Sequence, residues 1–178
     1  NFNDLRNFYR FVDGASGWNL NDNILGDHNT LDPAAPPELL LKSGMELTVE
    51  GAARIAGLPA LVAAFGVTAP GTTVTIGTVV KNILFSGGNI LLGGLGSDTI
   101  SGGGGTDLID GDRWLNVQLV ATLNDGTVRK VDDPRVLIPD VFADPQRLNP
   151  GNIVIERTIV TPTAAQVGPA DCSVATPL

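Results

Sequence analysis

Residues 93–110 read Gly-Gly-Leu-Gly-Ser-Asp-Thr-Ile-Ser-Gly-Gly-Gly-Gly-Thr-Asp-Leu-Ile-Asp. They are two consecutive copies of the nine-residue pattern G-G-x-G-x-D-x-U-x, in which U is a large aliphatic residue. Asp98 and Asp107 are each followed two positions later by an isoleucine, Ile100 or Ile109. Because side chains alternate between the faces of a strand, we expect both isoleucines to point inward and to stack. Each nonapeptide therefore predicts one turn of a coil, made of a loop, a metal ligand and a short strand.

The glycines of the two copies favour a site for a hard cation. Glycine reaches left-handed backbone conformations at low cost, so several carbonyl oxygens can converge on one point. Calcium takes about six to eight oxygen ligands at roughly 2.3–2.6 Å from carboxylates and backbone carbonyls, whereas magnesium demands octahedral geometry and keeps its waters. The expected calcium ligands are Asp98, Asp107, Gly94, Gly96, Gly103 and Gly105. A structural turn or a flexible linker is the alternative. Phosphate binding fits poorly, since the segment lacks a G-K-[ST] ending and its aspartates would repel the anion.

These residues resemble the RTX calcium-binding repeat. That family forms a parallel β-roll, in which calcium lies between loops of successive turns on the same side, two repeats apart. Stepping by nine residues extends the ligand row to Asn89, Asp98, Asp107 and Asn116. The resemblance implies a same-side pair of Asn89 and Asp107. Because Trp114 replaces the expected glycine, Asn116 is a weaker candidate than Asp110 and Asp112, which lie beside that degenerate turn.

The same spacing recurs near the start of the chain. Gly17, Asp22, Ile24, Gly26 and Asp27 match the spacing of Gly102, Asp107, Ile109, Gly111 and Asp112. We expect a separate single turn that docks beside the roll and contributes Asp22 or Asp27 to a further ion. The alternative is a surface loop, because Asn/Asp-rich stretches commonly form turns.

The composition suits a turn-rich β protein. The 178 residues include 22 glycines and 12 prolines, with 17% charged and 5% aromatic residues, and can bury one core. A net charge of −8 argues against nucleic acid or an anionic membrane as partner. No apolar run approaches the roughly 18 residues that cross a bilayer, so we expect neither a membrane span nor a signal peptide within these residues. The single cysteine, Cys172, is interpreted as an incidental or inter-chain thiol.

The expected fold is mainly β: a short parallel β-roll with flanking antiparallel strands and one or two short capping helices. A single domain is predicted over residues 1–160, with the roll at about 85–118, a helical cap at about 48–66 and an extended tail at 161–178. Thr48 is the expected N-cap of a helix over residues 49–56, and a second helix should run from Pro59 to Phe65. Further strands are expected at 72–76, 79–85, 114–123, 127–131 and 153–160, with Trp114, Val117, Leu119 and Ala121 near the core. A helical turn is expected at 140–143 and a tight turn at 149–152.

A wider resemblance covers most of the chain. Residues 9–27, 87–94, 107–117 and 149–155 are similar to a segment of very large secreted bacterial proteins that join an animal-type haem peroxidase domain to RTX regions. This implies an extracellular bacterial location within a larger polypeptide, in keeping with a chain that does not begin with methionine. The chain has one histidine, His28, whereas a haem peroxidase needs a proximal and typically a distal one. We therefore expect a surface histidine or a partner of Asp27, and no haem.

Two functional hypotheses remain open. The first is a non-enzymatic calcium-binding module that folds and is stabilised when calcium binds, as part of a larger secreted polypeptide. The second is a self-assembling unit, in which the strand at 153–160 or the tail pairs with a neighbouring copy to build a filament, surface layer or adhesive matrix. A remote enzymatic alternative is self-processing at an Asp-Pro bond, of which the chain has three, at Asp32, Asp133 and Asp144.

Overall fold

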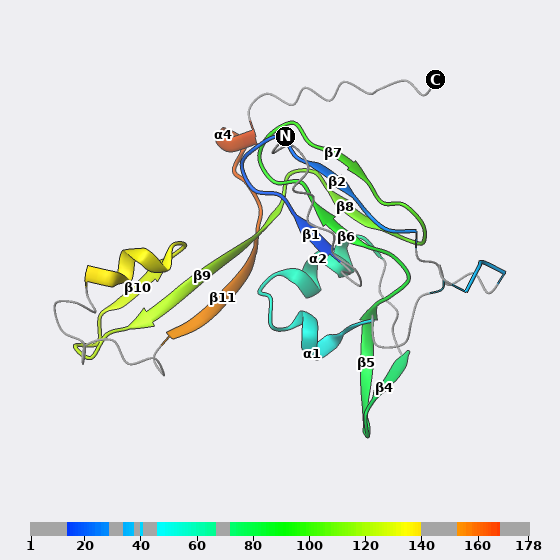
Figure 1. Ribbon diagram of the computed structural model, residues 1–178, viewed down its shortest axis with the longest axis horizontal. Coiled ribbons are helices and arrows are strands. Elements are labelled where there is room, and N and C mark those ends of the chain that lie inside the picture. Colours follow the sequence, from blue (N-terminus) through cyan, green and yellow to red (C-terminus); the bar gives the residue numbers. More distant parts are fainter. Residues whose placement is uncertain are drawn as a thin grey trace, which may run out of the picture.

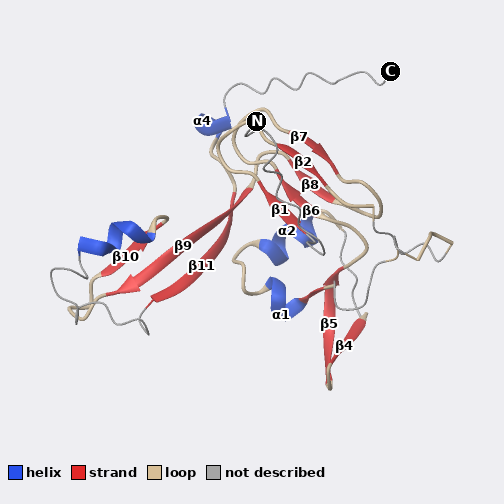
Figure 2. Ribbon diagram, in the orientation of Figure 1, coloured by secondary structure: helices blue, strands red, loops and turns tan. Residues whose placement is uncertain are grey.

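The computed structural model describes residues 14–28, 34–37, 40, 46–66, 72–139 and 153–167, and within them the protein is mainly β. Figure 2 shows strands joined by long loops, with few and short helices. In chain order the elements are β1 (Gly14–Ser16), β2 (Asn23–Leu25), β3 (Leu47–Thr48), α1 (Val49–Ala52), α2 (Leu58–Ala64), β4 (Thr73–Ile76), β5 (Val79–Phe85), β6 (Ile90–Leu92), β7 (Thr99–Ser101), β8 (Leu108–Asp110), β9 (Trp114–Thr122), β10 (Val128–Val131), η1 (Pro134–Leu137), β11 (Ile153–Val160) and α4 (Ala164–Val167).

Five three-residue strands pair in parallel, and together with their loops we call residues 14–28 and 87–112 the parallel-strand region. One sheet has the order β1-β6-β8 and a second pairs β2 with β7. Along the chain the strands alternate between the two sheets, and residues 17–22, 93–98 and 102–107 form the loops between them. Figure 1 shows β1 and β2, from the start of the chain, beside β6 and β7.

The N-terminal segment docks against the nonapeptides, as the sequence predicted. Ala15 lies opposite Leu91 in the first sheet, and Ile24 lies opposite Ile100 in the second. Residues 17–22 between β1 and β2 form a mostly exposed loop, so the Asn/Asp-rich stretch is a surface loop within a docked turn. About sixty residues separate this N-terminal segment from the strands with which it pairs, so the pairing is long-range in the sequence.

The core lies between the helices and one face of the β1-β6-β8 sheet. Ile90 and Leu108 are in register on neighbouring strands, and both pack in one cluster with Leu61, Val62 and Phe85. Fully burying an aliphatic side chain of this size contributes about 1.5–3 kcal/mol. The helices at 48–66 thus cover a sheet face.

Both predicted helices are present, and the first is shorter than expected. Thr48 Oγ1 accepts a hydrogen bond from the Gly51 backbone N–H at 3.0 Å, which confirms the predicted N-cap. The helix ends at Ala52 and not at Ala56, because Ala56 forms a parallel bridge with Thr158 of β11. A residue that pairs with a strand needs an extended backbone, which is incompatible with the last turn of a helix.

The opposite face of the β1-β6-β8 sheet carries the row Ala15, Leu91 and Ile109. Leu91 on the central strand is 2% exposed, but Ile109 is 39% exposed. Ile109 lies in register with Leu91, as expected for stacked side chains, but it remains partly open to solvent. Among the described residues β8 is the last strand of its sheet and the second sheet ends at β7, so little covers this side chain.

Antiparallel strands flank this region on both sides, as predicted. One sheet has the order β3-β5-β4 and another the order β10-β9-β11. The antiparallel pairing of β9 begins at Trp114, so the parallel-strand region ends before residue 114 and not near 118. Trp114 and Ala121 are buried as expected, but Val117 is 47% exposed and lies on the half of β9 that β10 does not pair with.

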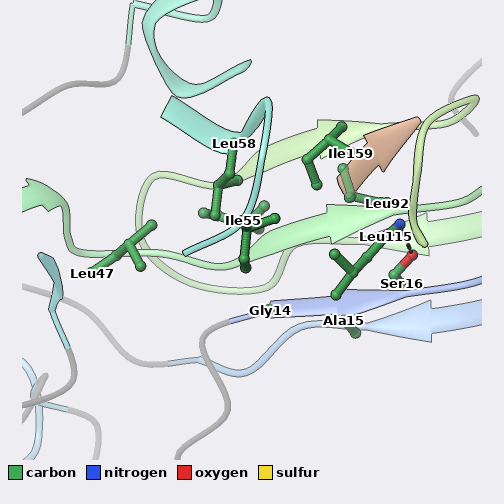
Figure 3. A pocket seen from close by; sticks show the side chains of 10 residues that line it. Gly14, Ala15, Ser16, Leu47, Ile55, Leu58, Leu92, Leu115 and Ile159 are labelled. Atoms are coloured by element: carbon green, nitrogen blue, oxygen red, sulfur yellow. Dashed lines mark hydrogen bonds between the residues drawn. The ribbon is translucent and has the colours of Figure 1, made fainter. Parts of the chain in front are cut away.

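Small residues of β1 leave an apolar cavity of about 220 Å³ beside the core. Gly14 and Ser16 lie in register with Ile90 and Leu92, so β1 presents almost no side chain where its neighbour presents two large ones. Leu47, Ile55, Leu58, Leu115 and Ile159 complete most of the wall (Figure 3).

Beyond β11 the described chain forms one helical turn, α4, where an extended tail was predicted. The expected features at 140–143 and 149–152, together with Cys172, lie outside the described residues. No helix among the described residues is both long and apolar enough to span a bilayer.

Candidate metal centre

Three loops of the parallel-strand region share one local design. Each begins with a glycine and carries an aspartate five residues later, in the pairs Gly17/Asp22, Gly93/Asp98 and Gly102/Asp107. The aspartate closes the loop and precedes the next short strand. The sequence spacing alone therefore positions each carboxylate where one turn lies against the next.

The carboxylates of successive turns are connected by equivalent hydrogen bonds on the two sides of the region. On one side the Asp22 backbone N–H donates to Asp98 Oδ1 at 2.8 Å. On the other side the Asn89 backbone N–H donates to Asp107 Oδ1 at 2.8 Å. The structure thus brings together the predicted Asn89/Asp107 pair and places Asp22 against Asp98. In Asp98 and in Asp107 the oxygen Oδ1 accepts this hydrogen bond, and Oδ2 takes no part in it.

Asp98 Oδ2 is buried and has no hydrogen-bond partner among the described residues. A Cβ atom added to Gly93 would lie 2.5 Å from this oxygen and 2.5 Å from the carbonyl oxygen of Gly111, so both oxygens border the space that the glycine leaves. A buried carboxylate oxygen without a donor is costly, because desolvation is not compensated. A cation supplies the missing interaction, since calcium binds both carboxylate and carbonyl oxygens.

The same arrangement recurs at Gly17. A Cβ atom there would collide with Asp22 Oδ2 and with the carbonyl oxygen of Gly93. In both places a first-position glycine lies between its own turn's aspartate and a carbonyl from the following turn. Gly17, Gly93 and the Gly111 carbonyl were not predicted as ligands, although their common first position in the pattern is visible in the sequence.

On the other side one turn is assembled from two distant pieces of chain. A Cβ atom at Gly26 would lie 2.6 Å from Asn89 Oδ1 and would collide with the carbonyl oxygen of Gly102. Asn89 Oδ1 also accepts a hydrogen bond from the Asp27 backbone N–H at 3.1 Å. In the turn that begins at Gly26, Asn89 therefore occupies the position that an aspartate occupies in the other loops. It comes from a part of the chain about sixty residues further on.

Four predicted glycine ligands have the backbone geometry expected of them. The φ angles are 97° at Gly94, 133° at Gly96, 89° at Gly103 and 90° at Gly105. All four lie in a region that other residues rarely adopt. The second and fourth positions of the nonapeptide are thus glycine for a conformational reason.

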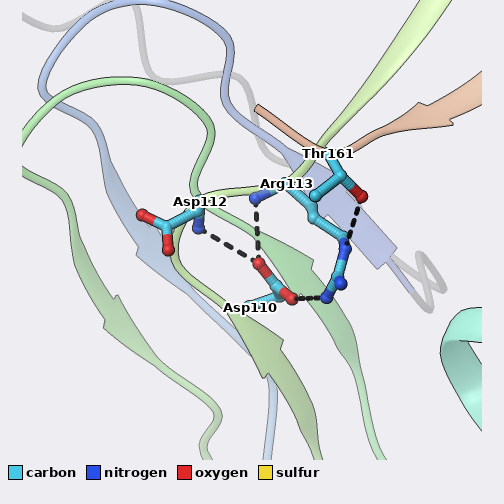
Figure 4. A network of polar contacts seen from close by, with 4 residues as sticks. All are labelled: Asp110, Asp112, Arg113 and Thr161. Carbon is cyan, nitrogen blue, oxygen red and sulfur yellow. Dashed lines mark hydrogen bonds and ion pairs between the residues drawn. The ribbon is translucent and has the colours of Figure 1, made fainter. Parts of the chain in front are cut away.

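Asp110 takes part in a polar network with Asp112, Arg113 and Thr161 (Figure 4). Its Oδ1 accepts the backbone N–H groups of Asp112 at 3.1 Å and Arg113 at 2.9 Å, and its Oδ2 is ion-paired with the Arg113 guanidinium. The Arg113 Nε–H also donates to Thr161 Oγ1 at 2.9 Å. The Asp110 carboxylate therefore helps to hold the exit of the parallel-strand region against the end of β11.

Two further predicted candidates are not among the aligned loops. The Asp112 carboxylate is exposed and points away from Asp110 in Figure 4. Asn116 belongs to β9 and lies opposite Thr158 of β11. The step of nine residues fails here because the chain has left the parallel strands at Trp114.

The described residues contain no group of three or more His, Cys, Asp or Glu side chains that could hold a metal ion by themselves. Any cation in these loops would therefore depend on backbone carbonyls as well as on one or two side chains from each pair of turns. Calcium accepts such mixed oxygen ligands, whereas a zinc site would need nitrogen or sulfur.

The fold and the loops define a mainly β protein with paired acidic, glycine-rich loops. Comparison with known proteins found no matching family model, no matching curated protein and no matching solved structure.

Proposed function

We propose that the parallel-strand region is a short, two-sided β-roll of the RTX type that binds calcium between the loops of successive turns. The observation that carries the proposal is the buried, unpartnered Oδ2 of Asp98, which borders the same space as the carbonyl oxygen of Gly111. A bound cation would remove the cost of that oxygen, and the loops of the neighbouring turns would supply further oxygens.

The two sides of the proposed roll differ in charge. One side carries Asp22 against Asp98, and the other carries Asn89 against Asp107. Two carboxylates attract a divalent cation more strongly than one carboxylate and one amide, and calcium affinity rises with the number of charged ligands. We therefore expect the Asp22/Asp98 side to have the higher intrinsic calcium affinity once its two turns are in contact. Its apparent affinity is lowered by the entropy of closing the chain between positions 76 residues apart, against 18 for the Asn89/Asp107 pair.

In this proposal the protein is a non-enzymatic module of a larger secreted bacterial polypeptide. Calcium would stabilise the folded state by mass action, by about 2.7 kcal/mol when its concentration exceeds the dissociation constant a hundredfold. Its acidic loops and its net charge of −8 give the unliganded state internal repulsion that a divalent cation would offset.

A second candidate function, calcium-dependent self-assembly, is favoured by the position of β11. This strand is at the edge of the β10-β9-β11 sheet, and Val154 and Ile155 on its first half are 59% and 51% exposed. Exposed edge strands can pair with a second chain. Light scattering would separate the two functions, since a simple module stays monomeric when calcium is added and an assembly unit forms large particles.

The direct test is titration of the whole chain with calcium and, in parallel, with magnesium. Isothermal calorimetry should report saturable calcium binding, and circular dichroism should report a gain of β structure over the same concentration range. Magnesium should give a much weaker response, because it does not accept irregular carbonyl-rich sites. The absence of calcium binding would refute the proposed function.

A further inference from the structure

The N-terminal turn, residues 14–28, is bound to the rest of the protein without any buried side chain. Every residue in this segment is exposed or only half-buried. Its largest apolar side chains, Trp18, Leu20 and Leu25, are 57%, 71% and 73% exposed. The hydrophobic contribution that holds most strands in place is therefore small for this turn.

Backbone hydrogen bonds provide most of the contacts of this turn with the nonapeptide loops. Leu95 N–H donates to the Trp18 carbonyl at 2.7 Å, Thr99 N–H to the Asp22 carbonyl at 2.8 Å, and Gly104 N–H to the Asp27 carbonyl at 2.9 Å. Ser97 N–H donates to Asn21 Oδ1 at 2.9 Å. Each such bond contributes about 0.5–1.5 kcal/mol net, which also has to offset the entropy lost on ordering the segment.

Several nonapeptide glycines are needed for this contact as well as for their own φ angles. A Cβ atom at Gly96 would lie 2.6 Å from the Leu20 carbonyl oxygen. A Cβ atom at Gly94 would collide with the carbonyl of Trp18, and one at Gly103 with that of Asp27. The glycine loops thus form a surface shaped for the backbone of the N-terminal turn.

The same contact leaves negative charge uncompensated when no cation is bound. Asp22 lies against Asp98, with which it shares a hydrogen bond through its backbone, and Asp98 Oδ2 has no donor among the described residues. Two neighbouring carboxylates repel each other, and the repulsion is relieved either by separation of the turns or by a cation between them.

We propose that residues 14–28 form a calcium-controlled docking segment, which is bound to the nonapeptide loops when calcium is present and released at a calcium concentration at which residues 87–112 remain folded. This inference rests on the proposed calcium binding and adds a regulated step to it. The Asp22/Asp98 pair joins positions 76 residues apart, so its occupation closes a long excursion of the chain. The Asn89/Asp107 pair spans only 18 residues and lies within the nonapeptide part.

Two sets of backbone amides report separately on the docked state of residues 14–28 and on the folded state of residues 87–112. Leu95, Ser97 and Gly104 donate to the docking segment. Gly93, Thr106 and Leu108 donate to Asp110, Gly87 and Asn89, all within residues 87–112. Hydrogen exchange measured while calcium is lowered should show loss of protection in the first set at a calcium concentration on the order of tenfold higher than in the second.

The possible results separate the failure of this inference from failure of the proposed function. Calcium binding in calorimetry with loss of protection in both sets at one concentration would leave the proposed function standing and overturn the regulated docking. Protection of the first set without calcium would overturn it too. No calcium binding at all would refute both.

A variant gives an independent test that does not depend on chelation. Gly96→Ala should expose the amides of Leu95 and Gly104 even at saturating calcium, while Thr106 and Leu108 stay protected. The matched control is Ser97→Ala in the same loop, where the side chain is exposed and the backbone N–H that contacts Asn21 is retained. Unchanged protection in Gly96→Ala would contradict the inference.

Discussion

The parallel-strand region and the β10-β9-β11 sheet are both β structure, yet they are held together in different ways. The strands of the first are three residues long, and its acidic loops contain a buried carboxylate oxygen without a donor. In the second, β9 pairs with β11 over eight residues, and side chains pair across the strands, as in the ion pair of Lys130 Nζ and Glu156 Oε2 at 2.6 Å. The sheet pairs opposite charges of its own strands in this way, whereas the loops contain a carboxylate oxygen without a donor.

This difference predicts which of the two regions depends on bound calcium for its stability. A long antiparallel pair gains stability from cross-strand side-chain contacts that do not require a bound metal. Short parallel strands with glycine-rich loops lack such contacts, and in our proposal calcium replaces them. Depletion of calcium should therefore affect the two regions unequally.

The largest expected effect is that of complete calcium removal. With excess chelator, amides of the parallel-strand region, such as those of Thr99 and Leu108, should exchange at nearly unprotected rates, while amides in the middle of β9 and β11 stay protected. Residue-resolved hydrogen exchange measures both. Equal loss of protection in the two regions would show that the β10-β9-β11 sheet also depends on calcium. It would contradict the proposed difference between this sheet and the parallel-strand region.

The next largest effect should follow substitution of Asp98, whose Oδ2 has no hydrogen-bond partner among the described residues. Asp98→Asn removes one charge from the Asp22/Asp98 side and should weaken calcium binding by at least about 10–100-fold, the range seen when even residues that only support a metal ligand are replaced. Asp132→Asn is the matched control, because Asp132 Oδ1 accepts a hydrogen bond from Gln118 in the antiparallel sheet and an asparagine oxygen can still do so. Equal calorimetric titrations of the two variants would contradict the assignment.

A smaller effect is expected when the calcium affinities of two variants, Asp107→Ala and Asp110→Ala, are compared. Asp107→Ala should weaken calcium binding and calcium-induced folding, because Asp107 lies against Asn89 in a pair of turns. Asp110→Ala should leave calcium binding closer to that of the original chain and lower thermal stability instead, because the Asp110 carboxylate pairs with Arg113. A calcium titration and a melting curve of each variant measure the two effects. Indistinguishable titrations would refute the ranking.

The strands were largely predictable from the sequence, because their signals are local. The strands expected over 79–85, 114–123, 127–131 and 153–160 are all present within a few residues of their predicted bounds. The Thr48 cap was visible for the same reason. The end of α1 was not, since it is set by a contact of Ala56 with a residue about one hundred positions away.

The pattern also predicted which loops come together, but it did not reveal how one turn is completed. A constant step of nine residues identified Asn89 and Asp107 as a pair, because the repeat fixes that geometry. No local signal shows that Asn89 completes the turn begun at Gly26, since the chain between them leaves and returns. The burial of Leu108 in place of Ile109 was missed for a related reason: it depends on which sheet face the helices cover.

A modest effect is expected for the ion pair of the antiparallel sheet. Lys130 and Glu156 have side chains that are 51% and 41% exposed, and exposed pairs contribute about 0.2–1 kcal/mol. Glu156→Gln should therefore lower the melting temperature slightly, the more so at low salt, and should leave the calcium titration unchanged. A shift in calcium affinity would show that the sheet and the loops are coupled.

The smallest expected effect lies at the start of η1, where the antiparallel part satisfies even an exposed charge. Arg135 lowers the pKa of the Asp133 carboxyl, first through its side-chain hydrogen bonds and then through its backbone N–H, and the pKa of Arg135 is raised in return. Because the folded-state pKa of Asp133 lies below its unfolded value, the stabilisation is present above the unfolded pKa and is lost as pH falls through the folded one. Carboxyl NMR titration should give a midpoint for Asp133 below the ordinary value, and Arg135→Gln should raise that midpoint with no change in calcium binding. A midpoint at the ordinary value in the original chain would mean that the pair does not persist in solution, since a fully solvated carboxyl shows no such shift.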